Sequence, residues 1–252
     1  MVSVIIPCYN ARQYICEALA SAVAQEYVHE VILVDDCSAD DSVACVQAWL
    51  DVHAAQTADI SIRVLQNAEN SGVAVSRNRG VQEADGKYIA FLDADDRFAP
   101  GKLKKQVELL EQTGACLCNT ARVLMTPDGS LTQTIMHTPE KITLAELEKT
   151  NVINCSSVVA PREILLKYPM QHSEVHEDYL TWLQMLRAYP YAVGIDEPLL
   201  EYRLSEHGKS RNKLKSARMT YRTYRLAGYP VWKSCRMFLN YMINGLKKYA
   251  TH

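Results

Sequence analysis

The sequence predicts an α/β protein with a mostly parallel central sheet flanked by helices, and two observations support this fold class. Within the first 115 residues, four runs rich in β-branched and aliphatic residues alternate with four segments whose apolar residues recur at helical spacing. Strands and helices in this order form right-handed βαβ units, which place parallel strands side by side. We therefore expect a Rossmann-like first half, followed by a mixed second half.

Each element of the first half follows from its own pattern. Buried strands are expected at VSVIIP (2–7), EVILVDD (30–36), SIRVLQN (61–67) and KYIAFLD (87–93). Helices are expected at residues 11–25, 40–53, 73–84 and 100–112.

The second half contains a hairpin, further strands and two helical regions. Segments 115–125 and 131–136 flank TPDGS, and Pro-Asp-Gly is a strong turn signal. Residues 151–160 are expected to form a strand, and Pro161 is suited to the first turn of a short helix. A helix is expected at 176–189, extended chain at 191–203, and a basic helical region at 209–249.

Composition and charge narrow the class of protein. The chain of 252 residues is 48% hydrophobic and 22% charged, which is ordinary for a soluble globular protein. The formal charge is −2, but twelve Lys and Arg and one acid lie between Arg203 and His252. The preceding residues are therefore acidic, and we expect the basic end to meet an anionic partner.

The cysteines and the apolar segments favour a cytoplasmic protein. The eight cysteines form no CxxC pair, so we interpret them as reduced thiols rather than as disulfides or zinc ligands. The first residues, MVSVIIPCYN, lack the basic region and the apolar length of a signal peptide. No apolar stretch approaches the roughly 20 residues that a membrane span needs.

Polar residues follow three of the predicted parallel strands. These are Tyr9-Asn10, Asp35-Asp36 and the acidic stretch Asp93-Ala94-Asp95-Asp96. Because ligands bind at the carboxyl ends of parallel strands, we expect the three segments to meet at one edge of the sheet.

The acidic stretch suits a divalent cation. Two carboxylates in an Asp-x-Asp pattern lie on one side of an extended chain. Mg²⁺ or Mn²⁺ prefers such oxygen ligands and can bridge the diphosphate of a nucleotide sugar. The alternative is a solvated junction between a strand and a loop.

Two other nucleotide-binding classes are excluded by missing motifs. A Rossmann dehydrogenase needs a GxGxxG turn after its first strand, where this chain has PCYNAR. The GxxxxGK[ST] motif of P-loop enzymes is also absent.

Several motifs in order resemble one enzyme family. VSVIIPCYNARQYICEAL, EVILVDDCSADDS, NSGVAVSRNRG and GKYIAFLDADD resemble the N-terminal half of family 2 glycosyltransferases with the GT-A fold. HEDYLTWLQML resembles the Glu-Asp catalytic motif of that family, and DEPLLEYRLS resembles the strand that follows it. The basic end is similar to that of bacterial enzymes that build surface polysaccharides of the teichuronic-acid and capsule type.

The resemblance implies a set of donor-binding residues. Asp36 would accept the N3–H of a uracil, Arg77 would reach the base or the diphosphate, and Asp93 would meet the ribose. The expected donor pocket consists of Pro7, Tyr9, Asn10, Asp36, Asn70, Ser71, Gly72, Arg77, Asp93, Ala94 and Asp95. Two alternatives stay open: that Asp36 serves only as the cap of the helix at 40–53, and that Arg77 pairs with an acid of the protein body.

The metal site is expected to use Asp93 and Asp95. Relatives place a histidine after the Tyr-Arg strand as a third ligand, whereas this chain has Ser205 there and His207 two residues later. We therefore expect His207 as the third ligand, with Ser205, Ser210 or water as alternatives. Asp96 is expected to support the site or to cap the helix at 100–112.

Asp178 is the expected catalytic base. An inverting transferase needs one carboxylate to remove a proton from the acceptor hydroxyl. Asp178 lies at the start of a predicted helix, where the helix dipole favours the ionised form. Adjacent Glu177 is expected to be its structural partner.

The basic end is expected to contact a membrane surface. Residues 230–249 mix aromatic and aliphatic side chains with lysine and arginine, as in helices that lie in a membrane interface. The alternative is a helix packed on the catalytic domain. No nucleic-acid-binding module surrounds this segment.

The resulting prediction is a metal-dependent, inverting glycosyltransferase at the inner face of the bacterial plasma membrane. It would transfer a hexose or N-acetylhexosamine from a UDP-sugar to a polyprenyl-diphosphate-linked saccharide. The expected GT-A domain spans 1–203, with a nucleotide-binding half (1–115) and an acceptor-binding half (116–203), and 204–252 form a basic helical extension. The alternatives are a sugar nucleotidyltransferase and a non-catalytic module that binds nucleotide sugars.

Overall fold

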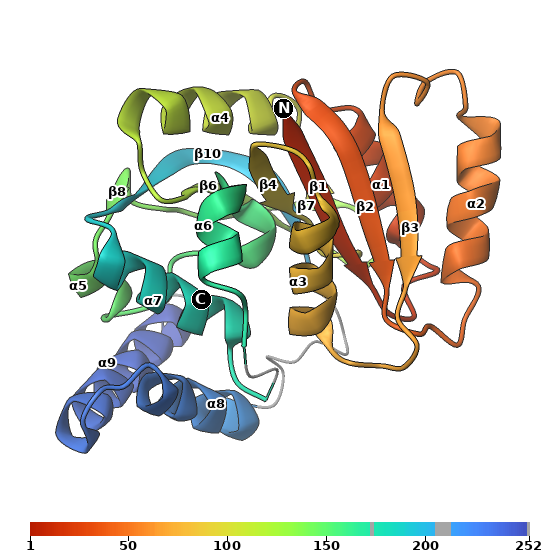
Figure 1. Ribbon diagram of the computed structural model, residues 1–252. Helices are drawn as coiled ribbons and strands as arrows, with labels where there is room; N and C mark the ends of the chain where they lie inside the picture. The colour runs from red at the N-terminus through yellow and green to blue at the C-terminus, as the bar shows by residue number, and fades with distance from the viewer. Residues whose placement is uncertain (172–173, 205–212, 251–252) are drawn as a thin grey trace.

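The computed structural model describes residues 1–171, 174–204 and 213–250. Within these residues the strands form one mixed sheet of ten strands, in the order β3-β2-β1-β4-β9-β6-β10-β5 (Figure 1). Strand β7 pairs with β6, and β8 pairs with β10. The predicted α/β class with a central sheet flanked by helices is therefore confirmed, although the sheet is mixed rather than mostly parallel.

The first half consists of the predicted parallel strands and their crossover helices. The strands are β1 (Val2–Cys8), β2 (Val28–Asp35), β3 (Ser61–Gln66) and β4 (Tyr88–Phe91). The helices are α1 (Ile15–Val23), α2 (Ser42–Val52), α3 (Val73–Glu83) and α4 (Lys102–Thr113). Strand β1 pairs in parallel with both β2 and β4, which confirms the sequence prediction.

Two apolar cores explain why β1, β2 and β4 are apolar at nearly every position. The prediction of a buried strand at 61–67 is wrong in this respect, because β3 lies at the edge of the sheet and its residues are exposed or partly buried. Ile5 and Ile32 point into a core shared with α3, whereas Val4 and Leu33 point into a core shared with α1 and α4. Because side chains alternate along a strand, burial on both faces requires a continuous apolar run. Gly80 lets α3 approach β1 closely, since a Cβ there would overlap the Ile5 side chain.

The second half extends the sheet with both antiparallel and parallel neighbours. Strands β6 (Cys118–Met125) and β7 (Leu131–Met136) form the predicted hairpin, and β6 also pairs in parallel with β10 (Ala192–Arg203). The short strands β5 (Arg97–Phe98) and β8 (Lys141–Ile142) were not predicted. The prediction of a strand over 151–160 is largely wrong, because β9 comprises only Val159–Pro161 and follows the 3-10 turn η1 (Cys155–Ser157).

The remaining helices pack beside the sheet and against one another. They are α5 (Leu144–Leu147), α6 (Arg162–Lys167), α7 (Glu177–Ala188), α8 (Lys213–Leu226) and α9 (Val231–Ala250). The predicted basic helical region is thus two helices, because Gly228, with φ of 81°, and Pro230 interrupt it. Tyr224 and Met237 share a core with Trp182 of α7, so both helices pack on the body.

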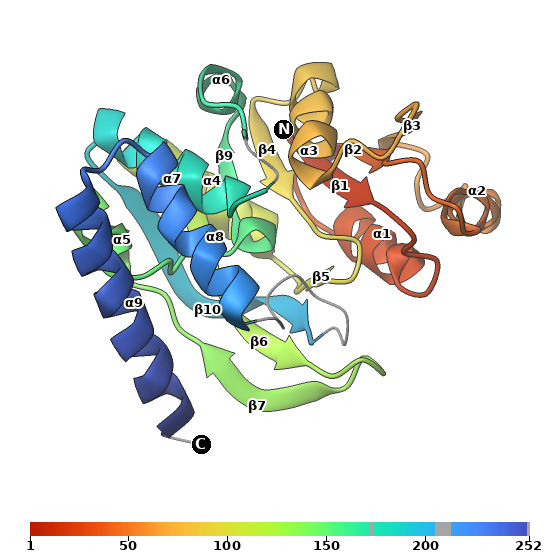
Figure 2. The same cartoon turned by 90° about the horizontal axis from the view of Figure 1, so that it is seen from below.

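The strands β2 and β3 point toward the side of the molecule on which α8 and α9 lie (Figure 1). Viewed from that side, α8 and α9 lie next to α7, at the opposite end of the molecule from α2 (Figure 2). The carboxyl ends of β2 and β3 therefore point toward the side of the molecule on which α8 lies.

Candidate active site

The acidic stretch after β4 forms a turn that is tied to two other segments. The backbone N–H of Asp96 donates to the carbonyl of Asp93 over 3.0 Å, and the N–H of Asp93 donates to Ser156 Oγ over 3.1 Å. Asp93 is about one-third exposed, whereas Asp96 is buried. The four residues thus present Asp93 and Asp95 at the edge of the sheet and direct Asp96 inward.

Arg203 holds this turn in place, which sequence reasoning missed. It is the last residue of β10 and is buried. Its Nε donates to the carbonyl of Asp95 over 2.8 Å, and its backbone N–H donates to Asp96 Oδ1 over 3.0 Å. Its Nη2 reaches Glu17 of α1 over 2.7 Å, and its guanidinium stacks over the Tyr14 ring. Arg203 therefore fixes the acidic turn against both α1 and the sheet.

Burial and like charge shape the electrostatics of the turn. Burial and the neighbouring charge of Asp93 raise the pKa of Asp95 to about 6. Burial and the charges of Asp95 and Asp93 also raise the pKa of Asp96, whose Oδ2 lacks a hydrogen-bond partner among the described residues. Asp96 therefore supports the turn, whereas α4 begins after Gly101 and is not capped by Asp96.

This arrangement fits a divalent cation that completes its coordination with ligands from a substrate. In the described part of the chain, no group of three His, Cys, Asp or Glu side chains is arranged to hold a metal ion. Mg²⁺ commonly binds one or two carboxylates together with substrate phosphates. Burial and the charge of Asp93 disfavour the ionised form of Asp95, and a bound cation would offset both effects. The predicted third ligand His207 and its alternatives Ser205 and Ser210 lie outside the described residues.

Asp36 lies at the carboxyl end of β2 and organises the loop before α3. Its Oδ1 accepts from Asn67 Nδ2 over 2.7 Å and from the Ser71 N–H over 3.0 Å, and its Oδ2 accepts from the Gly72 N–H over 2.7 Å. Gly72 has φ of 89°, which favours glycine. Because the N-cap of α2 is Asp41, Asp36 does not cap that helix.

The other predicted donor residues lie in or directly after the strands of the first half, or in the loop before α3. Pro7 is buried in β1, Ala94 is buried in the acidic turn, and Tyr9 and Asn70 are exposed. Asn10 adopts φ of 50°, and its Oδ1 accepts from the Ala39 N–H over 2.8 Å. The loops after β1 and β2 are thereby joined, as expected for two strand ends that form one pocket.

Arg77 lies deeper than the donor-contacting position that the resemblance implies. It is 4% exposed on α3, and its Nη2 contacts Asp93 Oδ1 over 2.6 Å. Its Nη1 contacts Glu177 Oε1 over 3.2 Å. The structure therefore brings together the acidic turn and the amino end of α7, which are distant in sequence, through one guanidinium.

Asp178 lies in the first turn of α7 and is half-buried. Burial and the adjacent Glu177 raise its pKa, whereas the charge of Arg77 opposes this shift. The expected lowering by the helix dipole is thus outweighed by desolvation and like charge. A raised pKa makes the carboxylate a stronger proton acceptor, which suits a general base.

His176 immediately precedes this turn and ties it to α8. The N–H of His176 donates to Thr223 Oγ1 over 3.3 Å, and its Nε2 lies 3.4 Å from the carbonyl of Ser216. The basic helix α8 therefore packs directly against the residues that precede Asp178.

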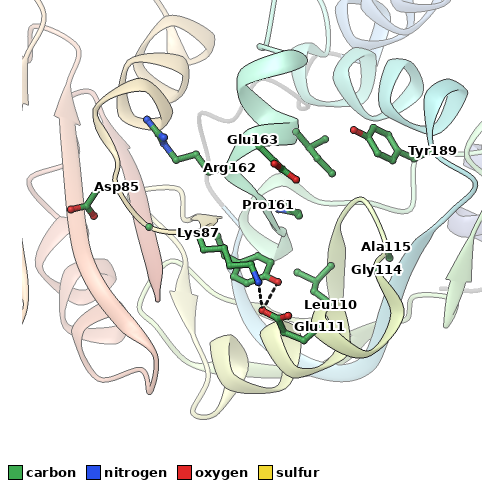
Figure 3. A pocket seen from close by; sticks show the side chains of 13 residues that line it. Asp85, Lys87, Leu110, Glu111, Gly114, Ala115, Pro161, Arg162, Glu163 and Tyr189 are labelled. Carbon is green, nitrogen blue, oxygen red and sulfur yellow. Dashed lines mark hydrogen bonds and ion pairs between the residues drawn. The ribbon is translucent and has the colours of Figure 1, made fainter.

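A cavity of about 570 Å³ lies elsewhere, at the amino ends of the strands (Figure 3). Several of its polar side chains bond to the protein itself: Lys87 Nζ and Tyr88 Oη both contact Glu111 Oε1, and Arg162 donates to the carbonyls of Val81 and Gln82. Ligands of parallel sheets bind at the opposite ends of the strands. The acids at the carboxyl ends are therefore the better candidate site.

Comparison with known sequences identifies the family. The profile described as Glycosyl transferase family 2 matches residues 3–167, which include β1 to β4 and the acidic turn. The chain is a family 2 glycosyltransferase.

Full-length relatives of this glycosyltransferase occur in bacteria. TuaG of Bacillus subtilis, named as a teichuronic acid biosynthesis glycosyltransferase, is 36% identical over 98% of this chain and 97% of its own length. WfgD of Escherichia coli is 29% identical over 99% of this chain and 95% of its own length. Its name describes a β-1,3-glucosyltransferase that uses UDP-Glc and GlcNAc-diphosphoundecaprenol.

Solved structures of the same fold support the GT-A architecture. Residues 1–349 of TarS from S. aureus, in complex with UDP-GlcNAc, have a TM-score of 0.71 and 21% identity, and the match covers 90% of this chain and 65% of that chain. A mannosyltransferase from Pyrobaculum calidifontis in complex with GDP-Man and Mn²⁺ also has a TM-score of 0.71, with 18% identity over 95% of this chain and 68% of its own.

Proposed function

We propose that this glycosyltransferase is inverting and metal-dependent, and that it transfers a hexose or N-acetylhexosamine from a UDP-sugar. The acceptor is a saccharide on a polyprenyl diphosphate, and the product belongs to a bacterial surface polysaccharide. The observation that carries the proposal is the contact of Arg77 with both Asp93 and Glu177. This contact supports the proposal, because it joins the acidic turn after β4 to the first turn of α7, which contains Asp178.

The donor side of the mechanism uses the ends of β1, β2 and β4. The Asp36 carboxylate has a lone pair left after its three hydrogen bonds, which can accept the N3–H of uracil. Asp93 meets the ribose, and Asp93 and Asp95 would hold Mg²⁺ or Mn²⁺. Such an ion supplies charge stabilisation for the leaving diphosphate.

The acceptor side uses the first turn of α7. Asp178 removes the proton from the attacking hydroxyl, and the hydroxyl oxygen attacks the anomeric carbon from the face opposite the leaving diphosphate. This attack inverts the configuration at that carbon. Glu177 remains paired with Arg77, which leaves Asp178 to face the acceptor. The relative WfgD, whose name specifies a β-linkage, supports this stereochemistry.

The polyprenyl-linked acceptor is supported by relatives and by the surface of α9. The names of WfgD and WfaP both specify GlcNAc-diphosphoundecaprenol. The described helices include none long and apolar enough to cross a bilayer. However, α9 exposes Trp232, Leu239 and Ile243 beside the basic Arg236. This mixture suits peripheral attachment to an anionic membrane.

A sugar nucleotidyltransferase is a weaker candidate. It would need a Gly-rich loop bearing Arg or Lys after the first strand, whereas this chain has PCYNAR there. A non-catalytic nucleotide-sugar-binding module would have no need for Asp178 at the site.

A donor screen with an inactive variant tests the proposal. Binding to the folded state raises the melting temperature, so we expect UDP-sugars with Mn²⁺ to stabilise the wild type. Asp178→Asn should retain this stabilisation but lose transfer by at least about 1,000-fold, and product analysis by NMR should show inversion. Wild-type transfer by Asp178→Asn would contradict the assignment of the base. Transfer that is unaffected by EDTA would contradict metal dependence.

Vesicle flotation tests the membrane proposal with the full chain. Replacing Trp232 and Leu239 by serine should reduce flotation with anionic vesicles at least about tenfold. Val52 is 80% exposed on the distant α2, so Val52→Ser is the matched control and should float like the wild type. Equal flotation of all variants would contradict attachment through α9.

A further inference from the structure

Arg77 is buried at the centre of the site, where it is poorly placed to contact a donor. Its side chain is 5% exposed, and each terminal nitrogen of the guanidinium faces a carboxylate. Its Nη1 also lies 3.9 Å from Met170 Sδ. A donor phosphate or base would have to displace one of these carboxylates to reach the guanidinium.

The two carboxylates belong to different halves of the reaction. Asp93 follows β4 on the donor side, and Glu177 begins α7 immediately before Asp178 on the acceptor side. The Asp93 side chain is 33% exposed, whereas that of Glu177 is only 9% exposed. Asp93 therefore has a face left for a ligand, whereas Glu177 is directed into the protein.

A second set of contacts attaches the segment before α7 to the same helix α3. Asn78 Nδ2 donates to the carbonyl of Met170 over 2.7 Å, and the N–H of Met170 donates to Asn78 Oδ1 over 2.9 Å. Because Asn78 is adjacent to Arg77, α3 contacts both the approach to α7 and its first turn. Helix α3 thus supports the donor side and the acceptor side together.

We propose that Arg77 is a positioning residue that sets the distance between the donor-side Asp93 and the base-bearing turn of α7. The proposal rests on the proposed function of Asp178 as base. A buried ion pair fixes geometry strongly, because removing one partner leaves an uncompensated charge. Without the guanidinium, Asp93 and Glu177 would repel each other, and the first turn of α7 would move away from the acidic turn.

Kinetics of Arg77→Lys and Glu177→Gln distinguish this role from a direct contact with the donor. A lysine retains the charge but presents no planar fork to two carboxylates. We expect Arg77→Lys to lower kcat for transfer about 100-fold, with the dissociation constant for UDP changed less than about threefold. We expect Glu177→Gln to lower kcat about tenfold, and the double variant to be no worse than Arg77→Lys. A direct contact predicts weaker UDP binding and additive losses, and either result would overturn the proposal.

Arg63 provides the matched control. It pairs with the buried carboxylate of Glu30 over 2.9 Å, outside the site. Arg63→Lys should therefore cost stability without lowering kcat. If Arg77→Lys does not fold, Glu177→Gln carries the test, because it leaves Arg77 and Asp93 paired. A wild-type kcat in folded Glu177→Gln would then refute the positioning role.

Hydrogen exchange separates failure of this inference from failure of the proposed function, since it needs no substrate. In the full chain, Arg77→Lys should speed amide exchange in the first turn of α7 at least about tenfold relative to wild type and Arg63→Lys. Unchanged exchange there would refute the inference even if Asp178 is the base. If exchange is faster in Arg77→Lys but the wild type transfers no sugar from UDP donors, the proposed function alone is refuted.

Discussion

The pH dependence of Mn²⁺ binding provides a direct test of the role of Asp95. Burial and the charge of Asp93 raise the pKa of Asp95 to about 6. A metal ion binds the deprotonated carboxylate, so protons compete with the ion. We therefore expect Mn²⁺ to bind more weakly as the pH falls through 6 in the presence of UDP.

The size of the effect follows from this pKa. For one competing proton, the apparent dissociation constant rises by the factor 1 + 10^(pKa−pH), which is about 2 at pH 6 and about 11 at pH 5. At pH 8 the factor is close to 1. An aspartate with an ordinary pKa near 3.9 would show almost no change over this range.

Calorimetry in two buffers of different ionisation enthalpy measures both the affinity and the protons released. We expect about half a proton to be released per ion at pH 6, and almost none at pH 8. Asp95→Asn should remove most of the affinity and the pH dependence together. An affinity that is constant from pH 5 to 8, or one that falls only near pH 4, would refute the reasoning.

The same pKa has a consequence for stability without metal. The folded state holds the Asp95 proton more tightly than the unfolded state. Asp95 therefore contributes its full stabilisation below pH 3.8, and the free energy of unfolding falls as the pH rises from 3.8 toward 6. Addition of Mn²⁺ with UDP should therefore stabilise the protein more at pH 7 than at pH 5.

Three further predictions concern stability and positioning. Burial lowers the pKa of Lys102 from 10.5 to about 7, so Lys102→Met should be more stable than the wild type. In urea unfolding, the difference in free energy of unfolding should widen by about 1.4 kcal/mol per pH unit as the pH falls from 10 to 7. A difference that stays constant with pH would contradict this prediction. Arg203→Lys should lower the free energy of unfolding by about 2–3 kcal/mol and weaken Mn²⁺ binding, because a lysine cannot hold Asp95 and Glu17 together; calorimetry showing wild-type affinity would count against this. Gly72→Ala should lower the free energy of unfolding by about 1–3 kcal/mol and weaken UDP binding, because an alanine at φ of 89° is strained. Thermal unfolding at the wild-type melting temperature would contradict this prediction.

The sequence alone determined the elements whose signals are local. The apolar runs that became β1, β2 and β4 are buried on both faces of the sheet, so their pattern is continuous and easy to recognise. Parallel pairing then requires their carboxyl ends to meet, which is why Asp36 and the acidic turn were predicted at one edge. The family motifs added the roles of these residues, which remain predictions.

The tertiary structure decided what depends on contacts between distant segments. The two-residue strand β5 exists only because β10 pairs with it, and no pattern of two residues predicts a strand. The partners of Arg77 and Arg203 lie up to 186 residues away in sequence, so no local signal indicates them. The direction of the pKa shift of Asp178 was predicted wrongly. Its place at the start of a helix suggests that the dipole stabilises the charged form, whereas burial and Glu177 outweigh the dipole and raise the pKa. Local sequence patterns therefore determined the strands and the position of the polar residues at their ends. Packing of distant segments determined which charged side chains face one another and in which direction their pKa values shift.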